Sequence, residues 1–294
     1  MKRIVAVILA ISSFCAIASA ERFYYFDHLN TLDGLPSNTI YCAMQDKDGF
    51  MWIGTRDGLC RYDGRSFIRL SEIAPVHNRT GLVREIAEDG MGKIWFTTPY
   101  GVGYYNPKTD EAGNINLPGN TMCRDLDVDG RGNVWIASHM LFRYDTEKNG
   151  MFTYSFGASQ PEFMAVDSFG TLWVLMLDGD IYTYDKLNDT FIKQSPSDRI
   201  KLIEPVQGGK LLVATQSEEV YLLDCISLST KTIYKAPPKT EIRCLCESMP
   251  GEFWIGTDNG LFIRRENEIY DGEAFHDDAT PASISANLIT PLFW

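Results

Sequence analysis

Short apolar runs separated by turn sequences repeat along most of this chain. The stretch from Gln45 to Gly64, QDKDGFMWIGTRDGLCRYDG, shows the order within one unit. An apolar run leads into Asp-x-x-Gly, Trp-Ile-Gly-Thr follows, and Asp-Gly precedes a third apolar run. Asp and Gly at these places are typical of tight turns and two-residue hairpins. The pattern predicts four short antiparallel strands per unit, at Thr39 to Met44, Trp52 to Thr55, Leu59 to Tyr62 and around Phe67, and no convincing helix.

The same order of residues recurs five more times. The anchor position of each unit is occupied in turn by Trp52, Trp95, Trp135, Trp173, Leu212 and Trp254. Successive anchors are 38 to 43 residues apart, a period typical of repeat architectures. Four antiparallel strands per unit with one aromatic anchor predict an all-β protein, a β-propeller of six four-stranded blades. We expect each anchor to pack between blades, and we assign it no binding role.

The two ends of the chain depart from this repeat. Residues 1–20 begin with two basic residues, continue with an apolar run and end in Ala-Ser-Ala, which predicts a signal peptide removed on export. Ser285 to Trp294 matches Pro36 to Gln45 in sequence, so the propeller of residues 21–294 is expected to stop inside an incomplete seventh blade. We interpret the sequence as a truncated piece of a longer protein.

Composition narrows the classes of function. Hydrophobic residues make up 45% of the chain, enough for a sizeable core. The net charge of −12 argues against a nucleic-acid partner, because binding phosphates needs a basic surface. The four histidines show no metal-ligand spacing, so we expect neither a metal nor a cofactor. The cysteines outside the signal peptide are expected to be mostly buried free thiols; they are Cys42, Cys60, Cys123, Cys225, Cys244 and Cys246.

The six positions that lie eleven residues before the anchors form a candidate ligand site. That position starts the innermost strand of a blade, so its six side chains should ring one mouth of the central channel. They are Tyr41, Arg84, Arg124, Glu162, Lys201 and Arg243. The loop after the second strand opens on the same face and adds Arg56, Tyr100 and His139. Converging cations beside an aromatic ring can bind a sugar carboxylate or sulfate, which arginine grips through two hydrogen bonds.

A structural role for these cations is the competing interpretation. Arg84 precedes Glu85 and Arg124 precedes Asp125, so both arginines could form ion pairs between blades. The aspartates that repeat with the first turn, such as Asp46 and Asp89, resemble catalytic carboxylates but are better explained as turn caps. We therefore assign no catalytic residue and expect no enzyme activity from this chain.

The segment Phe26 to Phe67 resembles the start of the periplasmic sensor region of hybrid two-component systems from gut Bacteroidetes. The pieces DGLPSN, WIGT and GLCRYDG carry the resemblance, and such blades are called two-component regulator propeller repeats. The resemblance implies a sensor of oligosaccharides released from complex glycans. It also implies an exported, periplasmic domain, a homodimeric receptor, and attachment to the inner membrane through a C-terminal part that this sequence lacks.

Histidine kinase, receiver and DNA-binding modules follow the sensor in that family, and this sequence contains none of them. The implied kinase activity therefore belongs to other parts of a full-length receptor. Two alternatives stay open. One is a stand-alone exported propeller that acts as a protein-binding scaffold. The other is a propeller lyase or hydrolase whose acid and base come from different blades.

Overall fold

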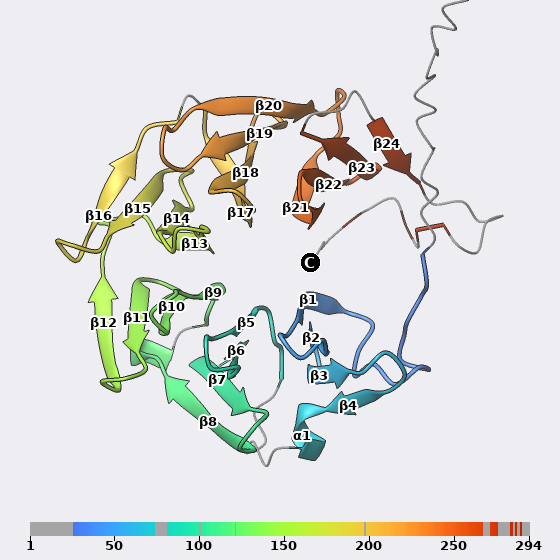
Figure 1. Ribbon diagram of the computed structural model, residues 1–294, viewed down its shortest axis with the longest axis vertical. Coiled ribbons are helices and arrows are strands. Elements are labelled where there is room, and N and C mark those ends of the chain that lie inside the picture. The colour runs from blue at the N-terminus through green and yellow to red at the C-terminus, as the bar shows by residue number, and fades with distance from the viewer. Residues whose placement is uncertain are drawn as a thin grey trace, which may run out of the picture.

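The computed structural model describes residues 26–73, 81–99, 101–120, 122–196, 198–266 and 271–275, together with 283, 284, 286 and 289. These residues form six four-stranded antiparallel sheets, which are arranged as blades around a common centre (Figure 1). The predicted all-β propeller with six blades is confirmed. The predicted signal peptide, residues 1–20, lies outside the described residues.

Each blade uses four consecutive strands, with the first innermost and the fourth outermost (Figure 1). Blades 1 to 3 contain β1 (Ile40–Gln45), β2 (Met51–Thr55), β3 (Gly58–Tyr62) and β4 (Phe67–Arg69); β5 (Ile86–Glu88), β6 (Ile94–Thr98), β7 (Gly101–Asn106) and β8 (Glu111–Asn116); and β9 (Asp125–Val128), β10 (Asn133–Ala137), β11 (Leu141–Asp145) and β12 (Gly150–Tyr154). Blades 4 to 6 contain β13 (Pro161–Val166), β14 (Leu172–Met176), β15 (Ile181–Asp185) and β16 (Thr190–Gln194); β17 (Ile200–Val206), β18 (Lys210–Thr215), β19 (Glu219–Asp224) and β20 (Thr230–Lys235); and β21 (Ile242–Met249), β22 (Glu252–Thr257), β23 (Gly260–Arg265) and β24 (Asp271–Ala274).

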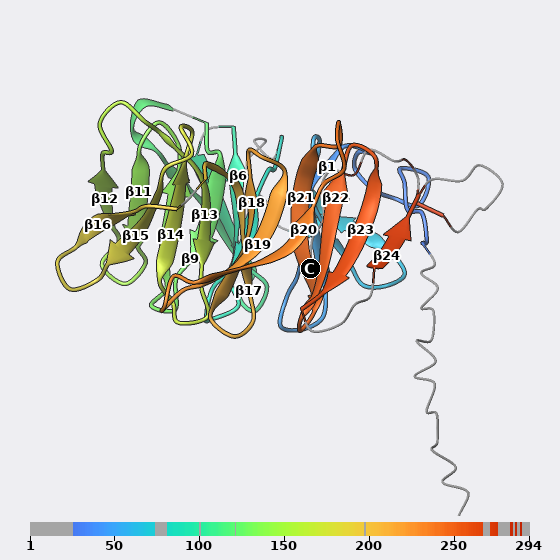
Figure 2. The same ribbon diagram turned by 90° about the horizontal axis from the view of Figure 1, so that it is seen from above.

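Helices contribute little to the described part of the chain. The only helical elements in it are the short α1 (Leu70–Ile73) and the 3₁₀ turn η1 (Pro118–Asn120). Figure 2 shows the ring edge-on, with the strands of each blade running across its thickness. The ends of the innermost strands therefore lie at the two mouths of the channel.

An aspartate fixes the turn between the first two strands in four blades. In blade 1, Asp46 Oδ1 accepts hydrogen bonds from the backbone N–H groups of Asp48 (3.0 Å) and Phe50 (2.9 Å). Gly49 adopts a φ of 89°, a conformation that favours glycine. The predicted turn-capping role is confirmed. The second carboxylate oxygen makes a bond that the sequence did not suggest, since it accepts the indole N–H of Trp52 at 2.7 Å.

The core lies between adjacent blades, where the anchor of one blade meets a tyrosine on the third strand of the next. The ring centroids of Trp52 and Tyr105 lie 5.9 Å apart, and those of Trp135 and Tyr184 lie 4.8 Å apart. Trp52 and Trp135 are fully buried, as expected for packing anchors. Leu212 is fully buried as well, so blade 5 forms without a tryptophan at this position.

The six described cysteines are free thiols, four buried and two half-buried, which confirms the prediction. Most of the segment predicted to begin a seventh blade, Ser285 to Trp294, lies outside the described residues. Its residue Ile289 donates its backbone N–H to the carbonyl of Thr257 at 2.8 Å. Val83 makes the equivalent bond to the carbonyl of Thr55 at 3.0 Å, just before the innermost strand of blade 2. Ile289 thus contacts blade 6 as Val83 contacts blade 1.

Candidate functional site

A cavity of about 440 Å³ opens at the end of the channel where the innermost strands begin. It is lined by residues of blades 1 to 4, namely Tyr41, Arg84, Glu85, Met122, Cys123, Arg124, Glu162 and Phe163. Four of the six positions predicted to ring the mouth are therefore brought together in one cavity. We call this cavity the mouth pocket.

Arg84 is positioned by backbone hydrogen bonds and by an aromatic ring. Its backbone N–H and that of Glu85 both donate to Thr97 Oγ1, at 2.9 and 3.1 Å. Its guanidinium carbon lies 5.2 Å from the centroid of the Tyr41 ring, a cation–π distance. Its Nε is buried and has no hydrogen-bond partner among the described residues. Stacking therefore fixes the guanidinium without saturating its donors.

Arg124 enters the mouth pocket from blade 3. Its backbone N–H donates to the carbonyl of Ala137 at 2.8 Å, and its Nη2 donates to Gln160 Oε1 at 2.7 Å. Neither Arg84 nor Arg124 takes part in the ion pairs formed by the described residues. The competing interpretation had both arginines forming ion pairs between blades. In the part of the chain that the structure describes, neither arginine forms such a pair.

Of the remaining predicted residues, those that the structure describes do not line the mouth pocket. Lys201 pairs with Glu218 at 2.6 Å, and Arg243 pairs with Glu241 at 2.8 Å. Arg56 is exposed. His139 is exposed too, and its ring packs 5.5 Å from that of Phe142. Tyr100 lies outside the described residues.

Four carboxylates form a cluster inside the channel that was not predicted. They are Glu85, which also lines the mouth pocket, Asp125 and Asp127 on β9, and Glu204 on β17. We call this set the channel carboxylates. In the other blades, the positions ten and eight residues before the anchor hold mainly apolar residues or cysteine. An acidic residue in this otherwise apolar column was the signal available in the sequence.

Burial and mutual repulsion shift the acidity of these groups. Burial raises the pKa of Glu85 well above its usual range, the charges of Asp125, Glu204 and Asp127 raise it further, and Arg84 opposes the shift. Burial also raises the pKa of Asp125 to about 7, that of Asp127 to about 6 and that of Glu204 to about 8. The pKa values of Asp125, Asp127 and Glu204 therefore lie near neutral pH, and that of Glu85 is shifted in the same direction.

Two of the channel carboxylates also join blades. Asp125 Oδ2 accepts the backbone N–H of Met164, and Asp127 Oδ2 accepts that of Val166 at 2.8 Å. Both donors belong to β13, so the two aspartates satisfy part of the free inner edge of blade 4. Within the described residues, no group of histidines, cysteines or carboxylates has the arrangement of a metal site.

The opposite end of the channel differs from the mouth pocket in the charged side chains that line it. A second cavity of about 360 Å³ lies where β13, β17 and β21 end, and its lining includes Glu204, Glu247, Ser168 and Gln207. No lysine or arginine lines this cavity among the described residues. The mouth pocket thus combines two arginines with two glutamates, whereas the charged side chains that line this second cavity are glutamates.

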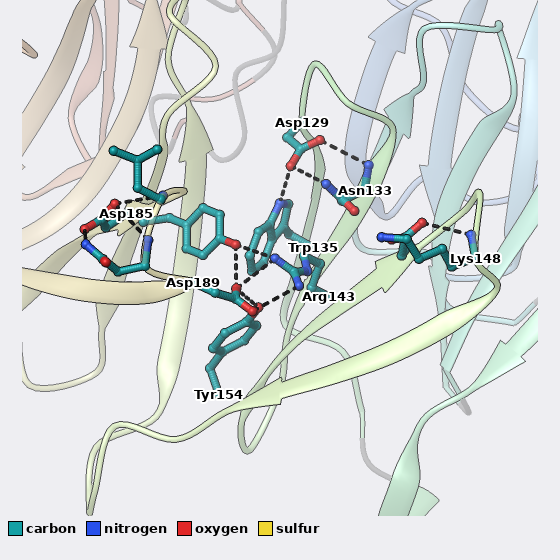
Figure 3. Close-up of polar contacts among 12 residues, drawn as sticks. Asp129, Asn133, Trp135, Arg143, Lys148, Tyr154, Asp185 and Asp189 are labelled. Atoms are coloured by element: carbon teal, nitrogen blue, oxygen red, sulfur yellow. Dashed lines mark hydrogen bonds and ion pairs between the residues drawn. The ribbon is translucent and has the colours of Figure 1, made fainter.

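A third polar cluster joins blades 3 and 4 near the outer strands (Figure 3). Arg143 lies over the ring of Trp135, with 5.5 Å between its guanidinium carbon and the ring centroid, and its Nη1 bonds Asp189 at 2.9 Å. The hydroxyls of Tyr154 and Tyr184 each donate to Asp189 at 2.6 Å. Asp189 is thereby satisfied by protein groups, and we assign this cluster to blade packing.

The repeat sequence of this chain is similar to that of known proteins. Residues 34–57 match the family model described as two component regulator propeller. A stretch of 69 residues is 35% identical to Histidine kinase P4 of Formosa agariphila and covers 23% of this chain and 5% of that protein. The resemblance drawn from the sequence is confirmed by this match.

Solved structures show the same fold. The extracellular domain of the hybrid two-component system BT4673 from B. thetaiotaomicron superposes with a TM-score of 0.76 at 18% identity, over 92% of this chain and 37% of that one. The extracellular domain of BT3049 from the same organism superposes with a TM-score of 0.72 at 18% identity, over 90% of this chain and 38% of that one. A streptogramin B lyase superposes with a TM-score of 0.69 at 14% identity, over 82% of this chain and 84% of the enzyme. In the described part of this chain, no helix is long and apolar enough to cross a membrane.

Proposed function

Because this chain carries the two-component regulator propeller repeat, we propose that it forms part of the extracytoplasmic sensor of a hybrid two-component histidine kinase. The similarity in fold to extracellular domains of such systems supports this role and an exported, periplasmic location. The proposal concerns sensing alone, since the chain covers 37% of the first of those solved domains and 5% of the curated kinase. Membrane attachment and homodimerisation are proposed for the full-length receptor.

We propose that the ligand is an oligosaccharide with a carboxylate or sulfate group. The observation that carries this proposal is the mouth pocket, in which Arg84 and Arg124 converge beside the Tyr41 ring. A guanidinium binds a carboxylate or sulfate through paired, charge-assisted hydrogen bonds. The rings of Tyr41 and Phe163 offer flat apolar surfaces to the faces of a sugar.

The test compares arginine variants in a calorimetric titration with uronic-acid and sulfated oligosaccharides. We expect Arg84→Gln and Arg124→Gln each to weaken binding about tenfold or more, because each removes a charge-assisted hydrogen bond worth roughly 1.5–3 kcal/mol. Lys201→Gln and Arg243→Gln are matched controls, since these cations occupy the same repeat position but lie outside the pocket lining. Equal losses in all four folded variants would point to a general charge effect and against this site.

A lyase is the second candidate, favoured by the similarity in fold to a streptogramin B lyase over 84% of that enzyme. At 14% identity that similarity concerns fold alone. The two candidates differ in turnover: incubation with the binding oligosaccharides should leave them intact if the chain is a sensor. A protein-binding scaffold, the third possibility, should bind none of them.

A further inference from the structure

Arg84 and Glu85 are neighbours in sequence, and both line the mouth pocket. The positive charge of Arg84 favours the ionised form of Glu85, while Asp125, Asp127 and Glu204 disfavour it. Arg84 makes no ion pair with a described carboxylate, and its buried Nε has no partner among the described residues. The same cation therefore favours the ionised form of the adjacent carboxylate and lines a pocket that can hold an anion.

The surroundings of Glu85 contain more acidic than basic groups. The charged groups of the neighbouring elements are Arg124, Asp125 and Asp127 of blade 3, Glu162 of blade 4 and Glu204 of blade 5, with the Tyr41 hydroxyl and the Cys42 thiol on β1. The nearby cations of blades 5 and 6 are engaged elsewhere, because Lys201 pairs with Glu218 and Arg243 pairs with Glu241. Arg84 is thus the cation that most directly balances Glu85.

We propose that an anion bound at Arg84 is taken up together with a proton on the channel carboxylates, so that the mouth pocket is a proton-linked anion site. This inference rests on the proposed function and specifies the electrostatics of the same pocket. An anion beside Arg84 adds negative charge near Glu85 and offsets the support that Arg84 gives to its carboxylate. Ligand binding then favours the protonated cluster, and by reciprocity protonation favours ligand binding.

The sign of the effect follows from the acidity of the cluster. The pKa values of Asp125 and Glu204 are raised to about 7 and about 8, and that of Glu85 is raised well above its usual range. Lowering the pH through this window adds protons to the channel. Anion affinity should therefore rise as the pH falls.

Sulfate is the probe, because it stays fully ionised between about pH 5.5 and 8.5, so any pH dependence belongs to the protein. Calorimetric titration in two buffers with different heats of ionisation counts the protons exchanged. We expect uptake of up to about one proton per sulfate, and an affinity roughly five- to tenfold higher at about pH 6 than at about pH 8. Sulfate binding without proton uptake would overturn the inference.

Glu85→Gln places a permanently neutral group at the same position. This variant should bind sulfate at about pH 8 nearly as tightly as the wild type does at about pH 6, with a flattened pH dependence. Glu147→Gln, at an exposed hairpin of blade 3, is the control and should keep the wild-type dependence. A Glu85→Gln protein with the full wild-type dependence would contradict the role of this carboxylate.

A second measurement needs no ligand. Carboxyl carbon NMR should show the pKa of the channel carboxylates rising further in Arg84→Gln, because the variant removes the balancing cation. An unchanged titration in that variant would overturn the inference. Saccharide binding without proton uptake would leave the proposed function intact and reject only the proton linkage, so the two failures are distinguishable.

Discussion

At the scale of single residues, one aspartate carboxylate accepts hydrogen bonds both from a turn and from the anchor tryptophan. In blade 3, Asp129 Oδ1 accepts the backbone N–H groups of Arg131 and Asn133, while Oδ2 accepts the indole N–H of Trp135 at 3.0 Å. Asp129 is 6% exposed and Trp135 is fully buried. A buried donor without an acceptor costs about 1–3 kcal/mol. This small network therefore fixes the orientation of the residue around which two blades pack.

Replacing Asp129 with Asn tests that network. The amide can keep one carbonyl acceptor but turns an N–H₂ group toward the turn or toward the indole. We expect the free energy of unfolding to fall by about 2 kcal/mol, since at least one buried donor loses its partner. Denaturant unfolding followed by tryptophan fluorescence measures the change. Asp145→Asn, which alters a turn cap at the outer hairpin of blade 3, should cost clearly less than Asp129→Asn.

The sequence predicted one half of this residue's role. Asp-x-x-Gly repeats ahead of the anchor, so turn capping by Asp46, Asp89, Asp129 and Asp167 could be inferred from spacing alone. The bond to the indole could not, because it joins positions six residues apart across a hairpin. Whether the two side chains meet there depends on strand twist and rotamer, which spacing does not determine.

At the scale of elements, blade 5 shows that the repeat tolerates a missing anchor. Its β17 and β18 pair in the same way as the corresponding strands of the other blades, although Val206 and Leu212 replace the Asp and Trp of blades 1 to 4. Leu212 is fully buried and packs with Phe253 and Ile255 of blade 6. Strand pairing and apolar burial thus suffice where the polar network is absent.

Restoring the tryptophan alone should harm this blade. Leu212→Trp adds volume to a filled core and buries an indole N–H without the aspartate that accepts it elsewhere. We expect a loss of about 2–3 kcal/mol in the free energy of unfolding, from overpacking together with the unpaired donor. Thermal unfolding of Leu212→Trp beside Val206→Asp/Leu212→Trp separates the two causes. A stabilised single variant would show that the blade 5 core holds spare volume.

At the scale of the whole molecule, the channel couples stability to pH. Burial raises the pKa of Asp127 to about 6, that of Asp125 to about 7 and that of Glu204 to about 8, while an unfolded chain holds such groups near about 4. The folded state therefore binds more protons than the unfolded state between about pH 4 and 8. This contribution to stability is complete below the unfolded pKa and is lost as the pH rises through the folded values.

We expect the melting temperature of the chain to fall between about pH 5.5 and 8.5. Differential scanning fluorimetry across that range measures it. Glu204→Gln should raise the melting temperature at the alkaline end and flatten the profile, because it removes one of the charges that repel each other in the channel. A melting temperature that increases steadily toward pH 8.5 would contradict this account.

Only part of the candidate site could be predicted from the sequence. The repeat placed six equivalent positions at one mouth, and four of them do line one cavity. Lys201 and Arg243 lie outside that lining and pair with Glu218 and Glu241. Glu218 belongs to the turn before β19 and Glu241 to the loop before β21, and the repeat period says nothing of which loop carboxylate meets which cation. Glu85 and Asp125 were considered only as ion-pair partners, and the cluster of channel carboxylates was missed because its members are scattered over three blades and meet only when the ring closes.

Two backbone hydrogen bonds to a preceding blade have an evolutionary consequence. Val83 and Ile289 make equivalent hydrogen bonds to the preceding blade, whatever side chain follows them. Within this one chain the next position already holds Tyr, Arg, Glu and Lys, while the anchor is Trp in five of six blades. The proposed site would thus place recognition at positions of each repeat that are separate from those that form the fold. Gene duplication followed by exchange of a few codons at the mouth could give each descendant a new ligand without rebuilding the ring.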